Sequence, residues 1–198
     1  MLIAAITEAA LPSKAVMPVP AHIRRIILTG FMGAGKSTVG RRLAAELGWK
    51  FLDVDAALEE TYNCTIASLF EQHGEEGFRR FESSAIVRAL GSDHVVVALG
   101  GGAPEILTNR LLLEQTPGSF VVFLDAPFGE LFDRCMLQPD AAIRPVLANP
   151  EAAAKRFEQR LPFYKRVARL TLETSGRTPE QTVEQLLSEM RALHAIKP

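Results

Sequence analysis

The segment GFMGAGKST, at residues 30–38, has the residue types of a polyphosphate-binding loop. It matches the pattern G-x-x-x-x-G-K-[ST] with Gly30, Gly35, Lys36 and Ser37. Glycines let backbone N–H groups curve around phosphate oxygens, and the N-terminus of the next helix adds donors and a favourable dipole. The lysine ammonium would neutralise β- and γ-phosphate oxygens, and the serine hydroxyl would bind Mg²⁺. The segment therefore predicts a nucleoside triphosphate site; a glycine-rich turn that caps a helix is the simpler alternative.

A phosphate loop alone does not choose among GTPases, motor ATPases and small-molecule kinases. The sequence contains no N-K-x-D segment of the kind with which GTPases read guanine. None of the expected strands ends in the paired Asp-Glu that is usual in motor ATPases. These two observations favour a kinase for a small molecule.

Two carboxylates follow the second apolar stretch, in the sequence FLDVD at residues 51–55. We expect Asp53 and Asp55 at the end of a strand, facing the same side because they are two residues apart. The carboxyl ends of parallel strands form the ligand crevice of such sheets. Carboxylates beside a phosphate loop could organise magnesium and accept a hydroxyl proton. The alternative is a strand-end aspartate that caps the next helix.

Arginines recur in three further segments, FRRFE at 78–82, AAIRPVL at 141–147 and EQRLPFYKR at 158–166. In the first, Arg79 and Glu82 are three residues apart and can pair on one face of a helix. In the second, an arginine before a proline suits a mobile lid that brings a cation onto the transferring phosphate. Each segment taken alone is equally compatible with a surface charge cluster or an ordinary loop.

Three consecutive glycines, Gly100, Gly101 and Gly102, end the apolar run VVVAL at residues 95–99. One glycine would suffice for a flexible turn. A Cβ at the second or third position would fill space that a ring-shaped substrate needs, and would keep backbone N–H groups from its hydroxyls. We therefore expect these glycines to line a substrate site.

The composition restricts the class of partner. The chain has 198 residues, 22 basic and 23 acidic, with a net charge of −1, which argues against a general nucleic-acid-binding protein. Hydrophobic residues make up 47%, so the chain can bury a core as a soluble protein. Cys64 and Cys135 lie far apart and favour reduced thiols in the cytoplasm over a disulfide. The four histidines are scattered and show no zinc-site spacing.

Apolar runs alternate with amphipathic segments along the chain, which predicts an α/β fold with three layers, α/β/α, around a five-stranded parallel sheet. The expected strands are 24–29, 50–54, 94–99, 119–124 and 169–173, and the expected helices are 36–47, 65–73, 77–90, 104–115, 127–137, 150–168 and 179–194.

The expected domain organisation is simple. In residues 1–21 the apolar stretch is interrupted by Glu8, has no basic segment before it and is too short to span a membrane. A signal peptide is therefore the less favoured alternative, and a poorly ordered leader is expected. Residues 22–198 are expected to form one domain, with a lid at about 138–149.

Taken together and in order, these motifs resemble those of the shikimate kinase family. The resemblance covers residues 24–190 and rests on the phosphate loop, a D-x-D, an F-R-x-x-E, a GGG, a lid R-P-L-L and an R-x-x-x-Y. They stand here as Gly30–Ser37, Asp53/Asp55, Phe78–Arg79…Glu82, Gly100–Gly102, Arg144–Leu147 and Arg160…Tyr164. The lid has Val146 where the family usually has leucine, and Pro104 stands where a valine is frequent.

The resemblance implies a P-loop fold like that of nucleoside-monophosphate kinases, with a mobile lid. It implies an enzyme that uses ATP and Mg²⁺ to phosphorylate the 3-hydroxyl of shikimate, giving shikimate 3-phosphate and ADP in aromatic amino acid biosynthesis. Such an enzyme is expected to be a cytoplasmic monomer that binds no nucleic acid and no membrane.

The resemblance also implies residue roles. Arg79 and Arg160 would clamp the substrate carboxylate, Asp55 would hold the reacting hydroxyl, and Arg144 would close over the γ-phosphate. Asp53 would act on magnesium through water. The remaining expected contacts are Gly101 and Gly102 for the substrate, Ser37 for magnesium, and Gly33, Ala34, Gly35, Lys36, Ser37, Thr38, Arg134, Arg144 and Arg177 for ATP.

Two other functions stay open from the residues. A related kinase could act on another small hydroxy acid such as gluconate, which also carries a carboxylate and hydroxyls. A nucleotide-binding regulator that has lost catalysis is the second, although such proteins usually lose the lysine, the magnesium serine or the base, and Lys36, Ser37 and Asp55 are all present.

Overall fold

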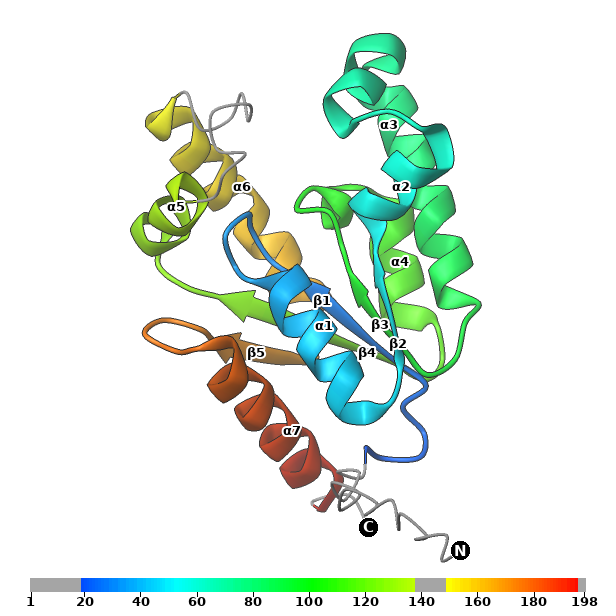
Figure 1. Cartoon of the computed structure of the whole chain (residues 1–198), viewed down its shortest axis with the longest axis vertical. Coiled ribbons are helices and arrows are strands. Elements are labelled where there is room, and N and C mark those ends of the chain that lie inside the picture. The colour runs from blue at the N-terminus through cyan, green and yellow to red at the C-terminus, as the bar shows by residue number, and fades with distance from the viewer. Residues whose placement is uncertain (1–18, 138–148, 196–198) are drawn as a thin grey trace, which may run out of the picture.

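The five apolar runs form one sheet in which all strand pairs are parallel (Figure 1). The computed structural model describes residues 19–137 and 149–195, and the side chains as far as residue 192. The strands are β1 (Arg25–Thr29), β2 (Lys50–Asp53), β3 (Val95–Ala98), β4 (Ser119–Asp125) and β5 (Leu170–Glu173), and their order in the sheet is β2-β3-β1-β4-β5.

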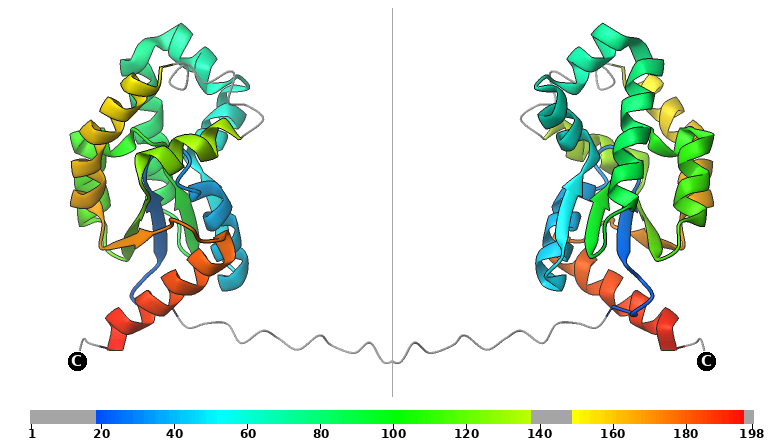
Figure 2. Two further views of the ribbon diagram at one scale, coloured as in Figure 1. Left: turned by 90° about the vertical axis from the view of Figure 1, so that its left-hand side faces the viewer. Right: turned by 90° about the vertical axis from the view of Figure 1, so that its right-hand side faces the viewer.

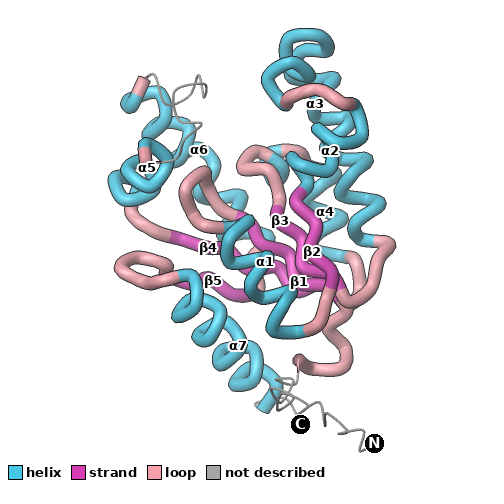
Figure 3. Tube along the Cα trace, in the orientation of Figure 1, coloured by secondary structure: helices cyan, strands magenta, loops and turns pink. Residues whose placement is uncertain are grey.

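Helices cover both faces of this sheet, which confirms the predicted three-layer α/β/α fold (Figures 1 and 2). The helices are α1 (Lys36–Leu47), α2 (Val54–Tyr62), α3 (Ile66–Leu90), η1 (Ala103–Glu105, a short 3-10 helix), α4 (Leu107–Gln115), α5 (Phe128–Met136), α6 (Pro150–Val167) and α7 (Pro179–Ala195). One face carries α1 and α7, and the other carries α4, α6 and the second half of α3 (Figure 3).

Alternation along the central strand divides the core between the two faces. On β1, Ile26 and Leu28 are fully buried in the cluster that includes α1 and α7, whereas Ile27 is fully buried in the cluster that includes α3. Successive strand residues point to opposite faces, so a strand covered on both sides must be apolar throughout. The continuous apolar run IIL is the sequence signal of this central position.

The end of β2 differs from the prediction. We expected Asp53 and Asp55 together at the end of a strand, but β2 ends at Asp53 and the unforeseen helix α2 begins at Val54. The Asp53 carboxylate accepts hydrogen bonds from the backbone N–H groups of Asp55 (3.1 Å) and Ala56 (3.3 Å). Asp53 is therefore an N-cap, and capping by a short carboxylate favours the helix over continued strand.

The predicted break between helices 65–73 and 77–90 is present as a kink within α3. Gly74 there has φ 66° and ψ 178°, values outside the helical region. The first half of α3 packs with α2 beyond the carboxyl ends of the strands, and the second half packs beside the sheet (Figure 1).

Residues 1–18 of the predicted leader and 138–148 of the predicted lid lie outside the described residues. Within the part of the chain that the structure describes, no helix is both long and apolar enough to cross a membrane.

Candidate active site

The phosphate loop joins β1 to α1 at the carboxyl edge of the sheet. Gly33 and Gly35 have φ values of 77° and 85°, which side chains other than glycine rarely adopt. A Cβ on Gly33 would also lie 2.2 Å from the carbonyl oxygen of Leu131. Among the described residues, no side chain caps the N-terminus of α1. Its first N–H groups are thus available to bind phosphate oxygens.

Lys36 points back into this loop. Its Nζ donates hydrogen bonds to the carbonyl oxygens of Gly30 and Phe31, each at 2.9 Å. Burial lowers the pKa of the ammonium to about 8, although the carboxylates of Asp55 and Asp53 favour the charged form. The loop therefore holds a cation with a weakened proton affinity where a polyphosphate would bind.

A serine hydroxyl and a carboxylate meet beside Lys36. Ser37 Oγ donates a hydrogen bond to Asp53 Oδ2 at 2.5 Å. Both are oxygen donors, which suit Mg²⁺, an ion that usually keeps several waters and shares its shell with substrate phosphates. Within residues 19–137 and 149–195, no cluster of three or more His, Cys, Asp or Glu side chains could hold a metal by itself. The donor set therefore fits a magnesium ion that arrives with a nucleotide.

Asp55 lies in the first turn of α2, next to this pair. Burial raises the pKa of its carboxyl, and the charge of Asp53 adds to the increase, while Lys36 opposes it. A carboxylate with a raised pKa accepts a proton more readily than an exposed one, which is the property that a general base needs.

Two arginines from different helices reach the same point. Arg79 of α3 and Arg160 of α6 have side chains only 11% and 7% exposed. Arg160 contacts Glu105 Oε2 through Nη2 at 2.8 Å and Nε at 3.0 Å, and Nη2 of Arg79 lies 3.7 Å from the same oxygen. Arg79 Nη1 also donates to Glu82 Oε2 at 2.8 Å. Together they form a buried pair of guanidinium groups, whose planar donors match the geometry of a carboxylate.

Glu82 is fully buried behind Arg79. Its second oxygen, Oε1, has no hydrogen-bond partner among the described residues. Burial raises the pKa of this carboxyl, whereas Arg79 lowers it. The predicted pair on one helix face is therefore part of the buried site and is not a surface ion pair.

The three glycines at the end of β3 allow charged side chains to approach closely. None of these three glycines has a positive φ, so backbone freedom does not explain them. A Cβ on Gly100 would lie 2.5 Å from Glu82 Oε1, and one on Gly102 would lie 2.3 Å from Arg79 Nη2. A Cβ on Gly101 would meet Arg160 Nη1 only at 3.6 Å, an ordinary contact distance.

Gly101 has a different constraint. Its carbonyl oxygen accepts a hydrogen bond from the hydroxyl of Tyr164 at 2.5 Å, and Tyr164 is fully buried. Burial raises the pKa of this phenol, so it stays a donor. The arginine and tyrosine of the R-x-x-x-Y segment therefore both face the glycine segment from α6.

A second group of expected residues lies on α5 and in the loop after β5. Arg134 of α5 donates to the hydroxyl (3.1 Å) and carbonyl (2.7 Å) of Thr174 and pairs with Glu130. Arg177 belongs to the same loop between β5 and α7, and its guanidinium donates to the carbonyl of Glu173. The two arginines predicted to flank adenine are thus placed around one loop.

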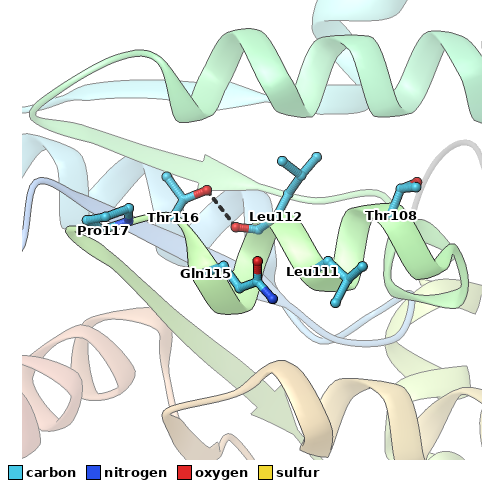
Figure 4. A pocket seen from close by; sticks show the side chains of 6 residues that line it. All are labelled: Thr108, Leu111, Leu112, Gln115, Thr116 and Pro117. Atoms are coloured by element: carbon cyan, nitrogen blue, oxygen red, sulfur yellow. Dashed lines mark hydrogen bonds between the residues drawn. The ribbon is translucent and has the colours of Figure 1, made fainter.

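A surface pocket also lies along α4 (Figure 4). Figure 4 shows the hydroxyl of Thr116 bonded to the carbonyl of Leu112, at 2.6 Å. None of its lining residues carries a charge, and none is an expected site residue; they are Thr108, Leu111, Leu112, Gln115, Thr116 and Pro117.

The structure brings most of the predicted site residues to one edge of the sheet, with Ala34, Ser37 and Thr38 in the phosphate loop and the first turn of α1. Arg144 lies outside the described residues. Sequence reasoning missed Glu105, which contacts both arginines of the carboxylate site. Its position three residues after Gly102, in the short helix η1 that follows the glycine segment, was the signal available.

Comparison with known proteins points to one family. The family model for shikimate kinase matches residues 32–191. The shikimate kinase of Thermobifida fusca is 41% identical over 167 residues, covering 84% of this chain and 94% of that protein. The chain therefore matches both the family pattern and nearly the full length of a relative.

Comparison with solved structures points to the same family. Shikimate kinase from Acinetobacter baumannii in complex with shikimate superposes with a TM-score of 0.80 at 33% identity, covering 88% of this chain and 96% of that one. A gluconokinase from Sinorhizobium meliloti reaches a TM-score of 0.56 at 17% identity, a likeness that concerns the fold alone.

Proposed function

Because the chain belongs to the shikimate kinase family, we propose that it transfers the γ-phosphoryl group of ATP to the 3-hydroxyl of shikimate. The products are shikimate 3-phosphate and ADP, as aromatic amino acid biosynthesis requires. The observation that carries the proposal is the buried pair of Arg79 and Arg160, which lies beside the phosphate loop and suits a carboxylate.

The nucleotide half of the reaction uses the phosphate loop. The backbone N–H groups around Gly33 and Gly35 bind phosphate oxygens, and the Lys36 ammonium leaves its two carbonyl partners for the β- and γ-phosphates. Ser37 would hold Mg²⁺ directly and Asp53 would hold it through water. The ion supplies positive charge that neutralises the phosphate oxygens.

The acceptor half uses the groups around the three glycines. Arg79 and Arg160 hold the carboxylate of shikimate, and planar guanidinium groups do so in a bidentate manner. The Asp55 carboxylate accepts a hydrogen bond from the reacting hydroxyl and so orients the hydroxyl oxygen toward the γ-phosphorus. The carboxylate takes the proton as the new O–P bond forms and the bond from the γ-phosphorus to the ADP oxygen breaks. Gly102 gives the Arg79 guanidinium room to reach the shikimate carboxylate, and Gly101 and Gly102 contact the ring.

The remaining parts of the proposal concern residues further out. Arg134 and Arg177 flank the adenine, and Arg144, on a lid at about 138–149, closes over the γ-phosphate. Residues 22–198 act as a single domain, and the enzyme is a cytoplasmic monomer.

Gluconate is not favoured as the acceptor. The gluconokinase of known structure shares only the fold with this chain. Phosphorylation of gluconate would still need a carboxylate site, so the arginine pair alone does not separate the two substrates. The family membership and the shikimate kinase at 41% identity favour shikimate, whereas the gluconokinase is 17% identical.

A coupled assay of ADP release tests the proposal directly. Purified full-length protein with Mg²⁺ and ATP is offered shikimate, gluconate and other hydroxy acids in turn. We expect ADP release that depends on shikimate. Turnover with gluconate and none with shikimate would instead assign the related sugar-acid kinase, and no turnover with any acceptor would favour a regulator.

The carboxylate clamp predicts a specific kinetic change. Replacing Arg79→Lys or Arg160→Lys puts a point charge where a fork of two N–H donors was, so we expect the KM for shikimate to rise about tenfold or more. The KM for ATP should stay near that of the unchanged enzyme. A shikimate KM that does not change in either variant would refute the clamp.

A further inference from the structure

The carboxylate of Glu105 lies where the proposed substrate would place its own carboxylate. Glu105 Oε2 accepts hydrogen bonds from Arg160 Nη2 (2.8 Å) and Nε (3.0 Å) and lies 3.7 Å from Nη2 of Arg79. These are the two guanidinium groups proposed to hold shikimate. One carboxylate oxygen of the chain itself therefore lies within ion-pair distance of both arginines.

Glu105 gives the two buried arginines a counter-charge. Arg79 has additional carboxylate partners in Glu82 and Glu75. For Arg160, whose side chain is 7% exposed, the carboxylate partner within the described residues is Glu105. A buried guanidinium without a counter-ion is costly, so the contact with Glu105 stabilises the buried charge of Arg160.

The backbone that carries Glu105 is held in place, whereas its side chain can leave. Arg110 Nη1 donates to the carbonyl oxygens of Pro104 (2.7 Å) and Glu105 (2.8 Å), and the N–H of Glu105 donates to Gly102 at 3.0 Å. The side chain itself is 32% exposed. Rotation of this side chain into solvent would free both arginines without any movement of η1.

We propose that Glu105 is an internal competitor that the carboxylate of the substrate must displace. This inference rests on the proposed function, because it takes shikimate as the incoming carboxylate. The exchange replaces one carboxylate by another, so the charge balance of the arginine pair is kept. A ligand that lacks a carboxylate cannot replace Glu105, and the residue thereby sets both the affinity and the selectivity of the acceptor site.

The variant Glu105→Gln tests this competition, because it keeps the size of the side chain and removes its charge. We expect it to bind shikimate about tenfold more tightly, the factor associated with one charge-assisted hydrogen bond. Isothermal titration calorimetry of the full-length protein with shikimate, in the absence of ATP, gives the Kd for shikimate. Glu114→Gln is the matched control, because Glu114 pairs with Arg166 on the surface at 2.9 Å, and its Kd should stay the same.

A second ligand tests whether charge is the cause. The methyl ester of shikimate has no carboxylate charge, so its affinity should gain much less from Glu105→Gln than the affinity of the free acid. An equal gain for both ligands would contradict an exchange of carboxylates. A shorter acid, Glu105→Asp, should place its carboxylate less well on the two arginines and give an intermediate Kd for shikimate. A melting curve of each variant verifies that it is folded.

Two results of the Glu105→Gln titration would overturn the inference. An unchanged Kd for shikimate would show that the Glu105 carboxylate does not compete, and a higher Kd would show that it positions the arginines for the substrate. Either result overturns the inference and leaves the proposed function intact. Failure of the unchanged protein to bind or phosphorylate shikimate would overturn the proposed function itself.

Discussion

At the scale of single residues, the site places a lysine of reduced proton affinity near two aspartates. Burial lowers the pKa of Lys36 to about 8, and burial also raises the pKa of Asp55. These opposite shifts have one physical cause, because a poorly hydrated site disfavours the charged form of acids and bases alike. The pKa values of Lys36 and Asp55 should therefore shift when a charged ligand binds beside them.

ATP binding should become coupled to proton uptake. A bound polyphosphate favours the charged ammonium and raises the pKa of Lys36 above about 8, so above that pH binding requires a proton. We expect the association constant for ATP to fall as the pH rises above about 8, by at most about tenfold per pH unit. Below about pH 8, ionisation of Lys36 should leave the association constant unchanged.

Calorimetry at pH ~9 in buffers of different ionisation enthalpy measures that uptake. The Lys36→Arg variant is the control, because its guanidinium stays charged and should take up no proton on binding. If the wild-type protein takes up no proton on binding ATP at pH ~9, the assignment of the low pKa to Lys36 is wrong.

Turnover should depend on the charge of Asp55. We expect Asp55→Asn to lower kcat about 10²- to 10⁴-fold, because the amide cannot accept the hydroxyl proton, while ATP still binds. Steady-state assays and ATP titration measure the two effects. Glu59→Gln, one turn further along α2, should keep its kcat; its Oε1 accepts from the N–H of Ile66, a role that the amide oxygen can fill. An Asn variant with near-normal kcat would leave Asp55 without this role.

At the scale of elements, the kink in α3 separates two functions of one helix. The half before Gly74 packs with α2, and the half after it carries Arg79 and Glu82 into the site. Gly74 adopts a backbone conformation that is almost exclusive to glycine, and nothing lies within 4 Å of where its Cβ would be. Backbone strain, without any steric clash, therefore determines the residue.

This separation predicts the effect of an added methyl group. Gly74→Ala should lower the free energy of unfolding by about 1–3 kcal/mol, measured by urea denaturation. Gly129→Ala in α5 is the matched control, since its Cβ also meets nothing within 4 Å and its φ is not positive. The control should raise stability by up to about 1 kcal/mol. Equal effects in both variants would show that conformation at Gly74 is not limiting.

At the scale of the whole molecule, the last helix of the fold packs against the helix that follows the phosphate loop. Helix α7 packs against α1, the helix that starts in the phosphate loop (Figure 1). Leu186 of α7 is fully buried in the core cluster that contains Leu43 and Val39 of α1. The position of the nucleotide loop thus depends on residues far from it in sequence.

Leu186→Ala should therefore destabilise the molecule without changing its chemistry. Removing a buried leucine side chain costs about 2–5 kcal/mol, which denaturant titration measures. The KM for both substrates should stay constant under conditions where the variant is folded. The exposed Ser188→Ala on the same helix should change stability by less than about 0.5 kcal/mol. A loss below about 1 kcal/mol for Leu186→Ala would contradict the packing described for α7.

The sequence was sufficient to predict the three-layer fold. Solid apolar runs such as IIL in β1 require cover on both faces, and this pattern is local to each strand. The phosphate loop was equally predictable, because its glycines and lysine act within nine consecutive residues, 30–38. Where neighbours in sequence determine the geometry, the sequence alone determined the outcome. The end of β2 shows the limit of this rule, because a single capping hydrogen-bond pattern at Asp53 started a helix that periodicity did not reveal.

Only the tertiary structure decided how the proposed acceptor site is built. Arg79 and Glu82 pair locally, but their burial and their approach to Arg160 depend on α3 and α6 converging on the glycine segment. The same convergence explains Gly100 and Gly102, whose missing side chains make room for charged groups from other elements. It also places Glu105 on both arginines. Contacts between segments far apart in the chain leave no periodic signal in it, since they depend on how the elements pack and not on the spacing of residues.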